Sequence, residues 1–195
     1  MSKWDKAQEQ EIVFWKAKWD FRTSYKKKYN LFLSRIEKIS KDSCILDIGC
    51  GAVTFSGMFG FKNLWLVDSL IGRYRMCKNN LRKSIAQIKA NAEYVLPMFN
   101  DGMFNNVFFL NCADHITPKS LDFIFSDLKR ICCGDIFFYS DFRCNKEQCN
   151  TCHPFIFKKE DFLRLTEGFE KEFCIYGESN EKGLEAVWAI MKVKK

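Results

Sequence analysis

The sequence lacks any long hydrophobic run. Its longest apolar segments, such as residues 107–110 and 136–139, are only as long as strands, whereas a membrane span needs about 20 apolar residues. The amino terminus has no apolar segment typical of a secretory signal. The 195 residues contain only three prolines, and no internal repeat or low-complexity tract. We therefore expect no membrane span, a cytoplasmic location and a single domain with one sizeable core.

Cysteine, by contrast, is abundant. Ten cysteines in 195 residues make a disulfide framework worth considering. However, Cys44, Cys50 and Cys112 fall inside or at the ends of apolar, strand-like runs, where a disulfide is implausible. Because no secretory signal is visible, we expect reduced thiols.

The formal net charge of +7 is concentrated near the amino terminus. Residues 1–41 contain eleven Lys or Arg and five acidic residues, so this segment carries a net charge of +6. A basic segment favours anionic partners such as phosphates, nucleotides or lipid headgroups. A solvated helix face explains the same composition equally well, and both interpretations stay open.

The spacing of apolar residues predicts an α/β protein. Ile12, Trp15 and Trp19 recur at i, i+3 and i+7 of a first helix, and a second helix is expected over 29–39. From residue 43 onward, strands alternate with helices, which implies a mainly parallel sheet with helices on both faces. The last two strands lack an intervening helix, so we expect an antiparallel hairpin at one edge. The expected strands are 44–48, 64–67, 94–96, 107–110, 136–139, 173–176 and 186–191, and the later helices are 71–88, 118–132 and 158–167.

The strongest chemical signal is the turn after the first of these strands. Residues 47–51 read Asp-Ile-Gly-Cys-Gly, and Asp68 ends the next strand, seventeen residues after Gly51. Ligands of doubly wound sheets bind at the carboxyl ends of the strands, and glycines let the backbone approach them closely. A carboxylate at Asp68 can accept hydrogen bonds from both ribose hydroxyls of a nucleoside. Because Thr54 stands where a dinucleotide-binding motif needs Gly or Ala, a nucleoside ligand without a pyrophosphate is favoured.

In their order, these motifs resemble those of the class I S-adenosylmethionine-dependent methyltransferases. Residues 47–51 are similar to the first motif of the family, and Asp68 to its ribose-binding acid. Residues 92–102 resemble the stretch that closes over the adenine. Residues 111–116 resemble the segment after the fourth strand, which lines the cofactor and faces the substrate. The resemblance covers about residues 44–169.

This resemblance implies a Rossmann-like, doubly wound, seven-stranded and mostly parallel sheet with an antiparallel last strand, formed by residues 42–195. Two positions depart from the family pattern near the cofactor: Val53 replaces a usual third glycine, and Asn91 replaces a common acid. An Asp usual near the start of the fourth strand is replaced by Asn105 or Asn106. The residues implied to bind S-adenosyl-L-methionine are Asp47, Gly49, Gly51, Asp68, Asn91, Ala92 and Asn111.

His115 is the candidate catalytic residue. Methyl transfer from a sulfonium mainly requires alignment of the acceptor, the methyl group and the sulfur, but a hydroxyl acceptor also benefits from a base that removes its proton. Histidine is the common base near neutral pH, and His115 lies just beyond a strand's carboxyl end. Asp114 is available to orient it. A histidine that only shapes the pocket is the alternative.

By resemblance, residues 1–41 form a helical lid over the pocket, within the same domain. Trp15, Trp19 and Tyr25 are candidates to stack on a ring of the acceptor, and residues 26–28 to meet a phosphate. Tryptophans at helical spacing are more often part of a core, so this structural interpretation is favoured over the functional one.

The most unusual spacing belongs to Cys144, Cys149, Cys152 and His153, in the loop after the fifth strand. Three thiolates and an imidazole suit tetrahedral zinc. The same spacing opens the plant-type iron–sulfur pattern, with Cys174 as a distant fourth ligand. Unlinked thiols in a polar loop are the favoured interpretation, so zinc is not an expected cofactor. The step from His153 to the following proline resembles a His-Pro step before the last helix in some relatives, which makes a substrate loop another alternative.

The sequence thus predicts an enzyme that transfers a methyl group from S-adenosylmethionine to a small hydroxyl acceptor, sugar-like, phosphorylated or otherwise anionic. Two alternatives stay open. The basic segment supports an RNA or nucleotide methyltransferase, but no Asn-Pro-Pro-Tyr-type motif is present, so nucleic acid is not the expected partner. The departures at Val53 and Asn91 support a catalytically silent binding or scaffold protein with the same fold.

Overall fold

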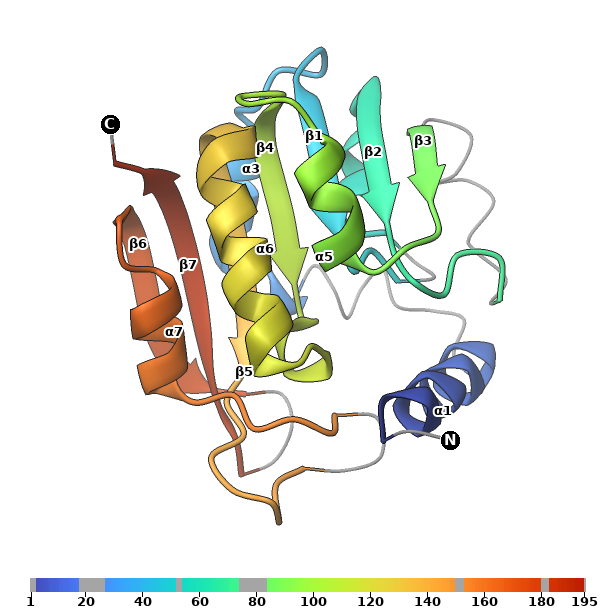
Figure 1. Cartoon of the computed structure of the whole chain (residues 1–195). Helices are drawn as coiled ribbons and strands as arrows, with labels where there is room; N and C mark the ends of the chain where they lie inside the picture. Colours follow the sequence, from blue (N-terminus) through green and yellow to red (C-terminus); the bar gives the residue numbers. More distant parts are fainter. Residues whose placement is uncertain are drawn as a thin grey trace.

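The computed structural model describes residues 3–17, 27–51, 54–73, 84–149, 153–179 and 183–194. Its centre is a seven-stranded sheet in the order β3-β2-β1-β4-β5-β7-β6 (Figure 1). Neighbours among β1 to β5 are parallel, whereas β7 runs antiparallel to both β5 and β6. The predicted sheet is therefore confirmed. The strands are β1 (Cys44–Ile48), β2 (Asn63–Val67), β3 (Ser84–Ile88), β4 (Phe104–Leu110), β5 (Cys132–Asp141), β6 (Phe169–Glu178) and β7 (Glu185–Val193).

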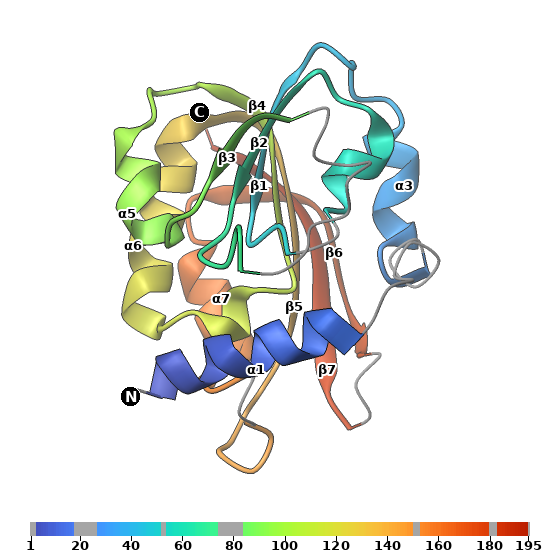
Figure 2. The ribbon, with the colours of Figure 1, turned by 90° about the vertical axis from the view of Figure 1, so that its right-hand side faces the viewer.

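Helices cover both faces of this sheet. Successive side chains of a strand point to opposite faces, so Phe137 and Phe138 of β5 enter different apolar cores, and both are fully buried. Burial on both faces explains why the central strands are continuous apolar runs rather than alternating ones. Among the described helices, those after β3 lie on one face and α3 lies on the other (Figures 1 and 2). They are α5 (Ala92–Val95), α6 (Pro118–Ile131) and α7 (Lys159–Leu165), opposite α3 (Asn30–Ile36).

Helix α6 shows how the local sequence fixes an element. Thr117 is its N-cap, and the threonine side chain accepts a hydrogen bond from the backbone of Ser120. Pro118 at the first helical position needs no hydrogen-bond partner for its nitrogen. The apolar residues recur at helical spacing and form the buried stripe Leu121, Ile124, Phe125, Leu128 and Ile131.

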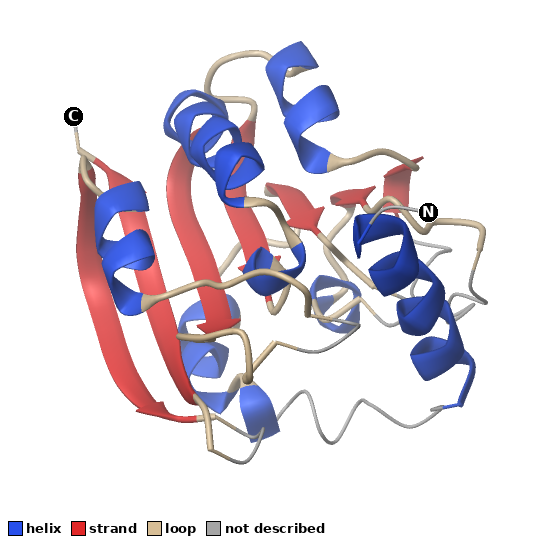
Figure 3. Ribbon diagram, turned by 60° about the horizontal axis from the view of Figure 1, so that its bottom comes forward, coloured by secondary structure: helices blue, strands red, loops and turns tan. Residues whose placement is uncertain are grey.

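Helix α1 (Lys3–Ala17) lies beyond the carboxyl ends of the strands (Figures 1 and 3). It is attached beside the end of β2: Ser69 donates a hydrogen bond of 2.7 Å to Gln8, and Arg73 pairs with Glu9 at 2.7 Å. Ile12 is buried in the core on the α3 side. Helix α1 thus lies at the carboxyl edge of the sheet, and the lid formed by residues 1–41 stays a prediction. Trp19, Tyr25 and Lys26, and the side chain of Trp15, lie outside what the structure describes.

Two predicted elements are wrong. Residues 94–96 were expected to be a strand, but α5 and a following 3-10 turn (Leu96–Met98) occupy this stretch. Residues 84–88 were expected to end a long helix, but they form the edge strand β3. Both stretches are five residues or shorter, and in such short pieces the apolar pattern of a strand resembles that of a buried helix segment. The rest of that helix prediction, from residue 74 to 83, lies outside the described residues.

In the part of the chain that the structure describes, no helix is long and apolar enough to cross a membrane. The cysteines in the same part of the chain are free thiols. Cys77 and Cys152 fall outside it.

Candidate functional site

The turn after β1 lies against the carboxyl ends of β2 and β4. The backbone of Gly49 donates a hydrogen bond of 2.8 Å to Val67 at the end of β2. Gly49 and Gly51 have φ angles of +65° and +62°, a region that suits glycine. A Cβ atom on Gly49 would lie 2.6 Å from the sulfur of Cys112. Both conformation and space therefore require glycine at position 49.

The carboxylate of Asp68 is fixed beside this turn. Its Oδ2 accepts a hydrogen bond of 3.0 Å from the backbone of Gly51, and its Oδ1 one of 2.8 Å from Leu70. These two contacts hold the acid that follows β2 against the glycine turn that follows β1. The sequence predicted this pair, and the structure brings the two residues together at the carboxyl edge of the sheet.

Asp47 lies within β1, one residue before its end, and is buried. The hydroxyl of Ser56 donates a short hydrogen bond to its carboxylate. Burial raises the pKa of Asp47 to about 7; the hydrogen bonds from Ser56 act against this shift, and the charge of Asp68 adds to it. Near neutral pH, Asp47 is therefore poised between its neutral and charged forms.

The other predicted cofactor residues follow β3 and β4. Asn91 is the N-cap of α5 and has an extended backbone, and Ala92 begins that helix and is buried. Asn111, after β4, has a φ of +57° although it is not glycine. Such a conformation costs about 1 kcal/mol or more and persists only when neighbours fix it, as the hydrogen bond of 2.8 Å from its backbone to Tyr139 does.

Lys28 connects the amino-terminal segment to this edge. Its Nζ lies 2.6 Å from the side-chain oxygen of Asn111 and 4.4 Å from the centre of the Tyr139 ring. Its backbone oxygen accepts a hydrogen bond of 3.0 Å from Trp188. A cation is thus held at the carboxyl end of β4, while the neighbouring Lys27 is exposed. Of the two described lysines in the segment 26–28, Lys28 is the one that contacts this edge.

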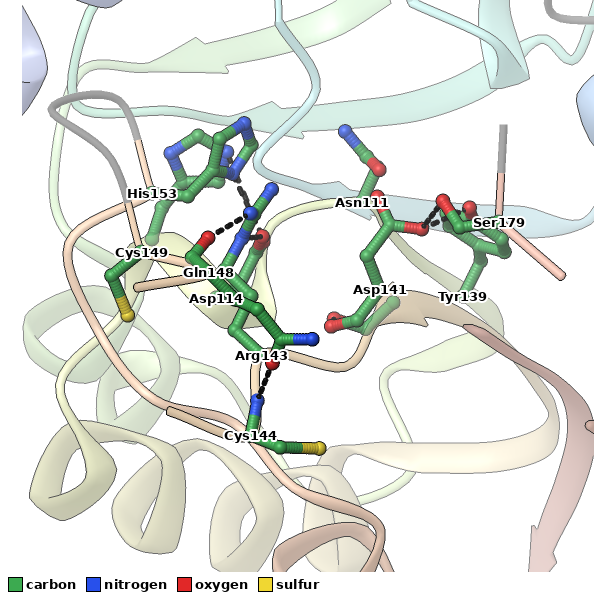
Figure 4. Close-up of polar contacts among 12 residues, drawn as sticks. Asn111, Asp114, Tyr139, Asp141, Arg143, Cys144, Gln148, Cys149, His153 and Ser179 are labelled. Carbon is green, nitrogen blue, oxygen red and sulfur yellow. Dashed lines mark hydrogen bonds and ion pairs between the residues drawn. The ribbon is translucent and has the colours of Figure 1, made fainter. Parts of the chain in front are cut away.

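A second polar group, which the sequence did not predict, lies at the end of β5 (Figure 4). The hydroxyl of Tyr139 donates a short hydrogen bond to Asp141, which also accepts one of 2.7 Å from Ser179. Burial and the charge of Asp141 raise the pKa of Tyr139, so the ring remains a neutral phenol. The sequence does not indicate this group because Ser179 is 38 residues from Asp141.

His115 is part of a buried cluster with Asp114, His153 and Arg143. Its Nε2 lies 3.9 Å from Oδ1 of Asp114, while Nδ1 of His153 lies 2.7 Å from Oδ2. The centres of the two imidazole rings are 4.2 Å apart. Arg143, fully buried, donates a hydrogen bond of 2.9 Å to Oδ2 of Asp114. The structure thus adds His153 and Arg143 to the predicted pair of Asp114 and His115.

The electrostatics of this cluster favour an ionised aspartate. Burial alone would raise the pKa of the Asp114 carboxyl. The hydrogen bond with His153, the two histidines in their protonated forms and the charge of Arg143 outweigh burial and hold that pKa well below its usual range. Asp114 is therefore a fixed negative charge between two imidazoles.

The sulfur atoms of Cys144 and Cys149, two members of the alternative zinc set, do not converge on His153. Cys144 is exposed, and the sulfur of Cys149 lies 3.5 Å from the backbone oxygen of Asn145. In Figure 4 both sulfur atoms point away from the imidazole of His153. Within the described residues, the possible metal ligands that converge with His153 are those of Asp114 and His115. Cys152 lies outside the described residues.

A hollow of about 270 Å³ opens at the opposite edge of the sheet. Asn106 and Asp135, near the starts of β4 and β5, line it together with Arg35, which pairs with Asp135 at 2.7 Å. Ligands of parallel α/β sheets bind at the carboxyl ends of the strands. The glycine turn, Asp68 and the histidine cluster all lie at that carboxyl edge, so the hollow is not the candidate site.

No family model matches the sequence, and no curated protein matches it. Solved structures do. A geranyl diphosphate C-methyltransferase from Streptomyces coelicolor, in complex with Mg²⁺, geranyl diphosphate and S-adenosyl-L-homocysteine, has a TM-score of 0.68 and 12% identity over 87% of this chain and 79% of that one. The N-methyltransferase NodS from Bradyrhizobium japonicum has a TM-score of 0.64 and 14% identity over 90% of this chain and 100% of that one.

A third similar structure is an S-adenosylmethionine-dependent methyltransferase from Archaeoglobus fulgidus, with a TM-score of 0.61 and 15% identity over 87% of this chain and 94% of that one. The strand order and the antiparallel β7 agree with these proteins as a class. The chain therefore has the Rossmann-like fold of the class I S-adenosylmethionine-dependent methyltransferases. At such low identities, this likeness concerns the fold.

Proposed function

We propose that the protein is a methyltransferase that uses S-adenosylmethionine and acts on a small hydroxyl acceptor. The observation that carries this proposal is the contact of 3.0 Å between the backbone of Gly51 and the carboxylate of Asp68. It joins a glycine turn and an acid at the carboxyl edge, between two adjacent parallel strands. This arrangement suits a nucleoside ligand because the turn admits close backbone approach and the carboxylate accepts hydrogen bonds from hydroxyls.

The described residues include candidate contacts for the ribose, the adenine and the amino-acid end of the cofactor. Asp68 would bind the ribose hydroxyls, and Gly49 to Gly51 would pass close to the ligand without side chains in the way. Asn91 and Ala92 would face the adenine, while Asp47 and Asn111 would lie toward the amino-acid end. The bound cofactor supplies the methyl group on a sulfonium centre. The polypeptide then has to hold the acceptor in line with that centre and exclude water.

The histidine cluster supports the choice of a hydroxyl acceptor. His115 is half-buried at the carboxyl end of β4, within 3.9 Å of the ionised Asp114. An imidazole there would accept the proton of a hydroxyl as the methyl group is transferred. Lys28, 2.6 Å from Asn111, would attract an anionic part of the acceptor. The similar proteins include an N- and a C-methyltransferase, so the fold alone does not select the acceptor atom.

Calorimetric titration with S-adenosylmethionine and with S-adenosylhomocysteine tests this proposal. We expect micromolar binding to the parent protein, loss of binding in Asp68→Ala, and unchanged binding in Asp42→Ala. Asp42 is a suitable control because it is an exposed acid, paired on the surface with Lys62. Binding would justify an acceptor screen that begins with sugar nucleotides. No binding to either compound by folded parent protein would refute the proposal and favour a silent scaffold.

A further inference from the structure

Asp114, His115 and His153 come from two loops that meet at the carboxyl edge. Asp114 and His115 belong to the 3-10 turn after β4 (Ala113–His115), and His153 belongs to the loop between β5 and α7. One oxygen of Asp114 and one nitrogen from each histidine lie within 4.8 Å of one another. The side chains of His115 and His153 keep 13% and 17% exposure, whereas that of Asp114 keeps 1%. The aspartate side of the cluster is thus closed to solvent, whereas the imidazoles are partly accessible to it.

The two oxygens of Asp114 have different surroundings. Oδ2 accepts the hydrogen bond from Arg143 and lies 2.7 Å from Nδ1 of His153. Oδ1 is buried and accepts no hydrogen bond from any described residue. A buried carboxylate oxygen without a hydrogen bond costs roughly 1–3 kcal/mol, and such atoms call for a physical explanation. A cation bound at Oδ1 would supply one.

We propose that Asp114, His115 and His153 bind a divalent transition-metal ion, zinc in the first instance. The ligands would be Oδ1 of Asp114 and one nitrogen of each histidine. Three protein ligands from two imidazoles and a carboxylate leave at least one position open, as in catalytic zinc sites. The sequence pattern does not suggest this set, because His153 is 38 residues from His115 and follows Cys149 and Cys152.

The positive charge of Arg143 affects which metal ion the site would prefer. Its guanidinium, 2.9 Å from Oδ2, neutralises the one carboxylate of the cluster. Mg²⁺ and Ca²⁺ depend on carboxylate and other oxygen ligands and are therefore disfavoured. Zinc and cobalt accept imidazole nitrogen readily. Arg143 also orients Asp114 through its hydrogen bond to Oδ2, as residues that hydrogen-bond to metal ligands commonly do.

Backbone hydrogen bonds flank the cluster at His115 and at Arg143. The amide of His115 donates a hydrogen bond of 3.1 Å to Cys112. Arg143 pairs with Phe157 in an antiparallel bridge, through hydrogen bonds of 2.8 and 3.1 Å, which closes the loop that carries His153. The Arg143 side chain also donates a hydrogen bond of 2.6 Å to the backbone of Gln148 (Figure 4). Ligands on supported loops lose little freedom on binding a metal.

A metal here would define the acceptor more closely, a consequence that rests on the proposed function. A small acceptor with two neighbouring oxygens, such as a 2-hydroxy acid or a vicinal diol, would bind the ion through both. Coordination makes a hydroxyl more acidic. His115 would then act as a ligand, and the ion, rather than the imidazole, would promote loss of the hydroxyl proton to solvent.

Cobalt(II) titration of protein purified without a histidine tag and treated with chelator tests the site. We expect visible d–d absorption that saturates at one equivalent of cobalt, and displacement of cobalt by one equivalent of zinc. His115→Ala and His153→Ala should each weaken binding at least tenfold. The matched control is the double variant Cys144→Ser with Cys149→Ser, which should bind cobalt like the parent.

Two results would overturn the proposal: binding of less than a tenth of an equivalent by folded protein, or a strong sulfur-to-cobalt charge-transfer band that disappears in the cysteine control. The second result would establish the cysteine site instead. Neither measurement uses the cofactor. Cobalt binding without S-adenosylmethionine binding would refute the proposed function and leave the metal site standing, and the reverse result would do the opposite.

Discussion

Arg143 and Asp114 form a fully buried ion pair, with Nε of the arginine 2.9 Å from Oδ2 of the aspartate. Arg143→Met would leave the buried charge of Asp114 without its arginine partner. We expect a loss of about 3 kcal/mol in the free energy of unfolding, the usual range for breaking a buried pair from one side. Urea denaturation followed by circular dichroism measures it.

The control for this variant is Lys62→Met. Lys62 pairs with Asp42 at 2.7 Å, but both side chains are about 70% exposed. Exposed pairs contribute about 0–1 kcal/mol, so this substitution should change stability little. Equal losses in the two variants would show that burial of the Arg143 pair has no energetic consequence.

Alanine substitutions at Gly49 and Gly72 distinguish the energetic cost of a positive φ from that of a steric clash. Both have positive φ, +65° and +87°, but a Cβ atom on Gly49 would lie 2.6 Å from Cys112, whereas one on Gly72 would meet nothing within 4 Å. Gly72→Ala should cost about 1 kcal/mol for the left-handed conformation. Gly49→Ala should cost about 1–3 kcal/mol more, because its methyl group overpacks the turn. Urea denaturation of both variants tests this, and similar losses would contradict the close approach of Cys112.

Asp47 should make stability fall as the pH rises. Its pKa is raised to about 7 in the folded protein, against about 3.9 in an unfolded chain. Between these values the folded state binds more protons than the unfolded state, so the free energy of unfolding decreases with rising pH. The contribution is complete below about pH 4 and lost above about pH 7. Since one pKa unit corresponds to about 1.4 kcal/mol, the total change is on the order of 2–4 kcal/mol.

Asp47→Asn removes this titration, so its stability should vary less between pH 4.5 and pH 7.5 than that of the parent. Asp42→Asn, a change at an exposed position, should keep the pH dependence of the parent. Urea midpoints at both pH values provide the measurement. A parent protein whose stability rises steadily over this interval, with Asp47→Asn behaving identically, would show that Asp47 ionises freely in the folded state.

If the imidazole of His115 accepts the proton of the acceptor, His115→Asn should lower turnover about 10²- to 10⁴-fold, the usual contribution of proton transfer by a positioned side chain. The affinity for S-adenosylmethionine should not change, because the predicted cofactor contacts lie at Asp68 and the glycine turn. Calorimetry and a methyl-transfer assay on the same preparation measure the two quantities. Full turnover by His115→Asn would exclude His115 from catalysis, and the same assay on His153→Asn would show whether His153 takes its place.

The sequence predicted those parts of the site whose signals are local. Residues 47–51 carry a strand end and its turn within five positions, and β1 has the predicted bounds of 44–48. Asp68 follows its own strand directly. In each case a single short segment contains both the apolar run and the chemical group, so no knowledge of distant contacts is needed.

The rest of the site depends on contacts between distant segments. Arg143 meets Asp114 across 29 residues, and Lys28 meets Asn111 across 83 residues. An arginine after an apolar strand gives no sign that it will be fully buried. His153 follows Cys149 and Cys152, so its sequence position suggests a metal set with cysteines. Its close contacts are instead with Asp114 and His115. Only the folded sheet brings these residues together.

Under the proposed function, the attachment of α1 through Ser69 and Arg73 would affect the rate of turnover. Ser69 lies in the turn that begins at Asp68, and Arg73 ends the next turn, so a ligand that tightens this stretch would also strengthen the hold on α1. Linked equilibria are reciprocal: a firmly seated α1 would slow the escape of whatever Asp68 holds. In such an enzyme, the departure of the spent cofactor, rather than the chemical step, would limit how often the cycle repeats.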